Sequence, residues 1–75
     1  MTLEIAKQIY IAAGGNRGHS SSEWKDIHAE MESIVAAQSD RAAAKVIHWW
    51  GCWDDKYTAT AFARRVRTAY QQYGP

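Results

Sequence analysis

His48 and Cys52 are the side chains whose spacing comes nearest to a reactive or metal-binding pair. They are four residues apart, so a helix would place them on one face, and Asp55 follows nearby. A zinc site needs four protein ligands, or three and a water molecule, so His19 or His28 would have to complete it through the fold. A catalytic cysteine needs a base, an orienting group and an oxyanion pocket, for which the sequence has no signature. We therefore predict no enzyme activity, no metal site and no cofactor.

Residues 14–20, Gly-Gly-Asn-Arg-Gly-His-Ser, have the glycine content of a phosphate-binding loop but neither its spacing nor its lysine. We interpret this segment as a flexible connection, in which Arg17 and His19 are the side chains able to contact a partner. The adjacent carboxylates Asp54 and Asp55 suit the start of a helix, where negative charge is favourable, better than acid–base catalysis.

Basic side chains are concentrated in the second part of the chain. The first forty residues hold three basic and six acidic side chains, whereas the remainder holds six basic and two acidic ones. On a helix, one face carries Thr60, Arg64, Arg67 and Gln71, with Arg65 beside them. Arginine offers a planar pair of donors, so we predict that this stripe binds phosphates or an acidic protein surface. The alternative is an ordinary solvated face with cations toward the helix C-terminus.

Tryptophan is over-represented, and three of the four tryptophans are clustered. Trp24 and Trp50 continue apolar helical stripes, so we predict that both lie in the core. On a helix, Trp49 is rotated by about 100° from Trp50, onto a face with Lys45. One interpretation makes Trp49, with Lys45 and Lys56 nearby, an exposed anchor for a protein partner. The other interpretation buries it under the glycine-rich segment.

Apolar spacing and capping residues predict four helices and no strand. They cover residues 3–13, residues 20–38 with a Ser20–Glu23 capping box, residues 39–50 with Ser39 or Asp40 as the cap, and residues 57–73. Gly51 is expected to end the third helix. The apolar stripes predict a single core, formed by Ile5, Ile9, Trp24, Ile27, Met31, Ile34, Ala43, Val46, Ile47, Trp50, Ala59, Phe62, Ala63, Val66, Ala69, Tyr70 and Tyr73.

The composition agrees with this helical pattern. The chain has 75 residues, of which 47% are hydrophobic, and a single cysteine. These values predict one compact all-α domain over residues 1–75, a three-to-four-helix bundle, rather than a disordered chain. No apolar run approaches the length of a membrane span, and no secretory signal is visible. Together with the lone cysteine, these features predict a cytoplasmic protein.

The function that we favour from these residues is a small non-enzymatic protein-binding module. It would dock on a larger macromolecular complex and block one of its functional surfaces. Base rates for short chains of this kind suggest an accessory or inhibitor protein of a mobile genetic element, for example a phage anti-CRISPR. The side chains predicted to bind the partner are Lys45, Trp49, Lys56, Thr60, Arg64, Arg65 and Arg67.

The alternative is a DNA-binding helix-turn-helix domain with the fourth helix as its recognition helix. The side chains facing bases or phosphates would then be Thr58, Thr60, Arg64 and Arg65. Two features count against this alternative. The predicted connection before the fourth helix is longer than the usual turn of about three or four residues, and a net charge of +1 is low for a phosphate binder. Self-association through an exposed aromatic side chain is a third interpretation.

Overall fold

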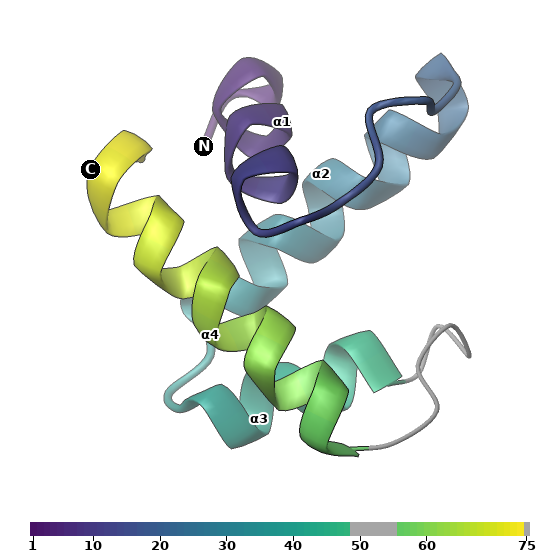
Figure 1. Ribbon diagram of the computed structural model, residues 1–75. Helices are drawn as coiled ribbons and strands as arrows, with labels where there is room; N and C mark the ends of the chain where they lie inside the picture. Colours follow the sequence, from purple (N-terminus) through teal and green to yellow (C-terminus); the bar gives the residue numbers. More distant parts are fainter. Residues whose placement is uncertain (49–55, 75) are drawn as a thin grey trace.

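Four α-helices make up most of the described part of the chain (Figure 1). The computed structural model describes residues 1–48 and 56–74, without the side chains of residues 48, 56 and 57. The helices are α1 (Leu3–Ala12), α2 (Ser21–Ala36), α3 (Asp40–His48) and α4 (Lys56–Tyr73). The described residues contain no strand, which confirms the all-α fold class. Among them, no helix combines the length and the hydropathy that a membrane span requires.

The predicted helix boundaries lie close to the observed ones. α1 ends at Ala12, and Ala13 is its C-cap. α2 ends at Ala36, two residues before the predicted end, because Ala37 has extended backbone with ψ of 148°. α4 begins one residue earlier than predicted, at Lys56. The predicted end of the third helix at Gly51 lies outside the described residues.

α4 is the helix that connects the two ends of the molecule. It packs along α3 at one end and against α1 at the other, and α2 contacts all three of the other helices. α1 and α3 lie at opposite ends, as Figure 1 shows, and do not contact each other. Because α3 and the beginning of α4 are neighbours, polar groups at the start of α3 can reach the outer face of α4.

One core lies between the helices, and most of the predicted stripes supply it. Trp24 is buried, as predicted, whereas Trp50 lies outside the described residues. Tyr73, at the end of the α4 stripe, is 48% exposed and does not join the core. The buried side chains are Ala6, Ile9, Ala13, Trp24, Ile27, Met31, Ile34, Ala43, Ala44, Ile47, Ala59, Phe62, Ala63, Val66 and Ala69.

The glycine-rich segment after α1 is fixed to the core by Tyr10. Gly14 has a φ of +105°, a left-handed conformation that suits glycine, and the amide of Gly15 donates to the carbonyl of Tyr10 at 2.9 Å. The Tyr10 hydroxyl is hydrogen-bonded to Nε2 of His19 at 3.2 Å. The His19 ring meets Trp24 edge-on, with centroids 5.1 Å apart. The segment is therefore held at several points, where the sequence had suggested a flexible connection.

Side-chain caps begin three of the helices. The predicted capping box of α2 is present: Ser20 Oγ accepts from the Glu23 amide, and Glu23 Oε1 accepts from the Ser20 amide at 2.8 Å. At the start of α3, Ser39 Oγ accepts from the Ala42 amide at 3.1 Å. Ser39 is therefore the cap, which leaves the carboxylate of Asp40 available for other contacts. Thr2 caps α1 in the same way.

The capping box makes stability depend on pH. The hydrogen bond from the backbone amide of Ser20 lowers the pKa of Glu23 below its ordinary 4.5, because it favours the ionised carboxylate. This contribution is fully present above pH 4.5 and is lost as the pH falls through the lowered pKa of the folded state. We expect Glu23→Gln to reduce the loss of stability between pH 6 and pH 3, measured by urea unfolding at both pH values. Glu30→Gln, the same change outside the capping box, is the control, and equal effects of the two changes would contradict the prediction.

Candidate functional site

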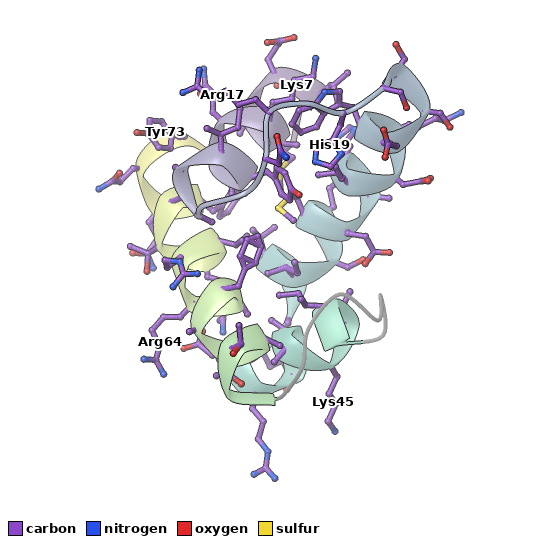
Figure 2. The ribbon with its side chains drawn as sticks, turned by 45° about the vertical axis from the view of Figure 1, so that its right-hand side comes forward. Lys7, Arg17, His19, Lys45, Arg64 and Tyr73 are labelled. Carbon is purple, nitrogen blue, oxygen red and sulfur yellow. The ribbon has the colours of Figure 1, made fainter. Side chains whose placement is uncertain are left out.

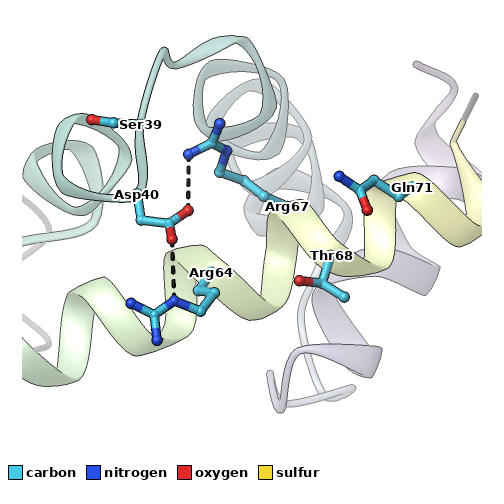
Figure 3. A pocket seen from close by; sticks show the side chains of 6 residues that line it. All are labelled: Ser39, Asp40, Arg64, Arg67, Thr68 and Gln71. Atoms are coloured by element: carbon cyan, nitrogen blue, oxygen red, sulfur yellow. Dashed lines mark hydrogen bonds and ion pairs between the residues drawn. The ribbon is translucent and has the colours of Figure 1, made fainter.

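Asp40 joins two of the predicted site arginines across the α3–α4 contact. Its Oδ2 accepts a hydrogen bond from Nε of Arg64 at 3.1 Å, and its Oδ1 accepts one from Nη1 of Arg67 at 2.8 Å (Figure 3). Asp40 is the first residue of α3, and both arginines lie on α4. The carboxylate thus holds the two guanidinium groups on either side of itself and fixes their orientation.

The pairing leaves a net positive charge and free donors. One carboxylate and two guanidinium groups sum to one positive charge, and each arginine keeps N–H groups that Asp40 does not use. The Arg64 side chain is 68% exposed, whereas those of Arg67 and Asp40 are 28% and 32% exposed. Ion pairs this exposed contribute about 0–1 kcal/mol to stability. Their main effect here is therefore to order the arginines rather than to stabilise the fold.

Arg65 has a different environment from its two neighbours. Its Nε donates to the carbonyl oxygen of Ala13 at 2.9 Å, and its guanidinium lies 5.9 Å from the centre of the Phe62 ring. Ala13 is the C-cap of α1, so this hydrogen bond satisfies a carbonyl at a helix end. The contact attaches the middle of α4 to the end of α1. Arg65 is exposed, yet part of its donor capacity is used within the fold.

Arg41 and Lys45 extend the basic region over the outer face of α3. They are four residues apart on the helix, both are exposed, and neither has an ion pair with any described residue. Figure 2 shows Lys45 projecting away from the body of the molecule at the α3 end, and Arg64 projecting from α4. Lys45 was a predicted site residue, whereas Arg41 was missed. The four-residue spacing of Arg41 and Lys45, which places both on one helix face, is the sequence signal that would have identified Arg41.

Charge is separated between the two ends of the molecule. Among the described side chains, α3 and α4 carry five cations and one carboxylate, Asp40. The chain before α3 carries three cations and five carboxylates. Because α1 and α3 lie at opposite ends, this imbalance runs along the molecule (Figure 1). We call Arg41, Lys45, Arg64 and Arg67 the basic surface.

An open pocket lies within the basic surface. It has a volume of about 390 Å³ and is polar (Figure 3). Three of its residues, Arg67, Thr68 and Gln71, follow one another along the outer face of α4. The pocket is lined by Ser39, Asp40, Arg64, Arg67, Thr68 and Gln71.

A second open pocket lies at the other end, between α1 and the end of α4. It has a volume of about 450 Å³, and its exposed lining is mainly apolar. Its lining residues are Gln8, Ile11, Ala12, Arg17 and Tyr73. Arg17, which the sequence offered as a partner contact, therefore lies away from the basic surface, on the side that also carries most of the carboxylates.

The structure describes only some of the other predicted site residues. Thr60 is half-exposed on α4, one turn before Arg64. Trp49 and the side chain of Lys56 lie outside the described residues, so their partner-binding roles stay predictions. The side chain of His48 and the whole of Cys52 also lie outside the described residues, so it stays a prediction that they form neither a metal site nor a reactive pair. In the part of the chain that the structure describes, no three histidine, cysteine or acidic side chains gather as a metal site.

Comparison of the chain with protein-family models, with curated protein sequences and with solved structures finds no match. The geometry of the basic surface therefore carries the functional argument without support from relatives.

Proposed function

We propose that this chain is a small non-enzymatic protein-binding module that docks its α3–α4 end on an acidic surface of a larger protein. One observation carries the proposal. The described side chains of α3 and α4 include five cations and a single carboxylate, and that carboxylate orders two arginines without neutralising them. The charge of the molecule is thereby directed toward one end, although the net charge of the whole chain is only +1.

This arrangement has two physical advantages: it orients the molecule toward its partner, and it orders the arginine side chains before binding. A charge imbalance along the molecule steers the basic end toward an acidic partner and speeds the encounter. Arginine is enriched among the residues that dominate binding energy. Because Asp40 already restrains Arg64 and Arg67, less side-chain entropy is lost when a partner binds.

Docking by this surface leads to a steric mechanism. The two described pockets are open to solvent, and neither is lined by a cysteine, a histidine or a lysine. The module would act by covering part of its partner, as an accessory or inhibitor protein that blocks a functional surface. The sequence-based suggestion of a mobile-element inhibitor remains part of this proposal.

Two hydrogen bonds make the helix-turn-helix alternative less favourable. Arg64 and Arg65 each use their Nε–H within the fold, on Asp40 and on Ala13. These bonds reduce what the two arginines can offer to DNA.

Charge reversal on α3 tests the proposal. We expect Arg41→Glu/Lys45→Glu to weaken partner binding by about 30-fold, the effect of losing two exposed ion pairs of about 1 kcal/mol each. The measurement is a tagged pull-down with and without nuclease, followed by titration of the captured protein. Neither side chain has a described internal partner, so the far-ultraviolet circular dichroism should not change.

The control is Arg17→Glu/Lys25→Glu, which changes the net charge equally at the opposite end. A protein complex that resists nuclease, survives in the control and is weakened by Arg41→Glu/Lys45→Glu supports the docking module. Equal weakening by both double variants would contradict it. Recovery of nucleic acid, with all co-purifying protein lost on nuclease treatment, would favour the DNA-binding alternative instead.

A further inference from the structure

The pocket beside Asp40 contains more hydrogen-bond donors than the fold uses. Arg67 donates one N–H of Nη1 to Asp40 and keeps its Nε–H and both N–H groups of Nη2. The Thr68 hydroxyl and the Gln71 amide have no hydrogen-bond partner among the described residues, and both line the pocket. Ser39 Oγ accepts from the Ala42 amide, so its hydroxyl hydrogen remains available to donate.

The residues that carry these donors line the same open pocket. Arg67, Thr68 and Gln71 are spaced along one face of α4, and Ser39 lies across from them at the start of α3. Figure 3 shows the amide of Gln71 turned toward Arg67, and Thr68 at the lower edge of the same helix. The one acceptor group in the lining with a negative charge, Asp40, is already bonded to both arginines. The vacant hydrogen-bonding capacity of this pocket is therefore mainly that of donors.

The charge of the pocket selects a singly charged anion. Its lining carries two guanidinium groups and one carboxylate, a sum of one positive charge. A carboxylate carries one negative charge and would neutralise this sum. A phosphate monoester carries about −1.5 to −2 at pH 7 and would leave excess negative charge beside Asp40. The two oxygens of a carboxylate also suit the paired N–H donors of a guanidinium group.

We propose that this pocket binds the side-chain carboxylate of an aspartate or glutamate of the partner protein. The proposal rests on the docking function above and specifies its recognition element: one acidic side chain, held by Arg67 with Thr68, Gln71 and Ser39 around it. Arg64 lies at the rim and supplies positive charge. Arg41 and Lys45 lie outside the pocket, so the docking surface and the carboxylate site can be tested separately.

The probe is a glutamate with both ends capped, titrated into the full chain at constant ionic strength. The matched glutamine compound and inorganic phosphate are the comparison ligands. Nitrogen-15 spectra that resolve the Nε–H groups of Arg64 and Arg67 and the side-chain amide of Gln71 provide the readout. We expect saturable shifts of the Arg67 and Gln71 signals with capped glutamate and no saturable shift with the glutamine compound.

Two variants test the residues. We expect Arg67→Gln and Thr68→Val/Gln71→Leu each to weaken the glutamate response about tenfold, since one charged or two neutral hydrogen bonds are lost. Thr68→Val/Gln71→Leu keeps both ion pairs to Asp40, so its effect on glutamate binding cannot come from a change in the α3–α4 contact. Lys25→Gln removes a charge at the other end and should leave the response unchanged.

Failure of the carboxylate site differs from failure of the docking function. If glutamate gives no saturable shift, or if phosphate binds and glutamate does not, the carboxylate proposal is overturned. A partner that Arg41→Glu/Lys45→Glu weakens, but that Thr68→Val/Gln71→Leu leaves unchanged, would keep the docking function and remove the pocket from it. A glutamate response confined to the pocket, with no partner sensitive to Arg41→Glu/Lys45→Glu, would overturn the docking function alone.

Discussion

Replacement of Gly15 by alanine should lower the free energy of unfolding by about 2–3 kcal/mol, the cost of forcing extra volume into a packed site. A Cβ at this position would overlap the ring of Tyr10. That ring has little room to move away, because its centroid lies 5.6 Å from Trp24, 6.0 Å from Phe62 and 5.5 Å from His19. The Gly15 amide also bonds to the Tyr10 carbonyl, which holds the backbone against the ring.

The loss should be measurable by thermal and urea unfolding. For a domain of this length, about 2–3 kcal/mol corresponds to a fall in Tm of about 10–20 °C. Gly18→Ala is the control, because a Cβ there would meet only the side-chain oxygen of Asn16, at 3.4 Å. The same substitution at position 18, three residues further along the chain, should then cost little. Equal losses at both glycines would mean that the Tyr10 ring does not set the cost.

The helices were predictable because the signals that define them are local. Trp24, Ile27, Met31 and Ile34 recur at the helical period, and all four are buried in α2. The Ser20–Glu23 capping box is complete within four residues of sequence, and the structure contains both of its hydrogen bonds. Such patterns depend on neighbours along the chain, so they can be read without knowledge of how the helices cross.

The ion pairs of the candidate site were not predictable in the same way. Arg64 and Arg67 are 24 and 27 residues from Asp40, and Arg65 is 52 residues from the Ala13 carbonyl that it contacts. The sequence predicted only a local role here, with Ser39 or Asp40 as the helix cap, and Ser39 is the one that fills it. Contacts over such separations are decided by the packing of α3 and α1 on α4, for which a helical stripe specifies a face but no crossing geometry.

The basic surface was therefore predicted in most of its composition, without Arg41, but not in its organisation. The sequence identified the arginine stripe and Lys45, and both lie at the α3–α4 end. It treated the three arginines alike, whereas the structure divides them. Arg64 and Arg67 share a carboxylate, and Arg65 bonds to the end of α1. Since hydrogen-bonding partners decide which donors are free, this division changes which residues are expected to bind a partner.

The basic surface depends on the packing of α3 against α4 and α2. The described part of α3 has nine residues, a length at which an isolated helix is unstable in water. Its buried side chains in the described region are Ala43, Ala44 and Ile47, of which Ile47 is the largest and is fully buried. Because Asp40 is at the start of this helix, displacement of α3 would also remove the carboxylate that orders Arg64 and Arg67.

Ile47→Ala should therefore cost about 3 kcal/mol of stability and weaken partner binding as well, although position 47 is buried. Urea unfolding measures the first effect. Hydrogen exchange should show faster exchange in α3 than in α2, since α3 loses its largest anchor. Val46→Ala is the control, because Val46 is only half-buried and its loss should cost less than half as much. If Ile47→Ala destabilises the fold but leaves the Arg64 and Arg67 signals and partner binding unchanged at temperatures where the protein is folded, α3 does not position the basic surface.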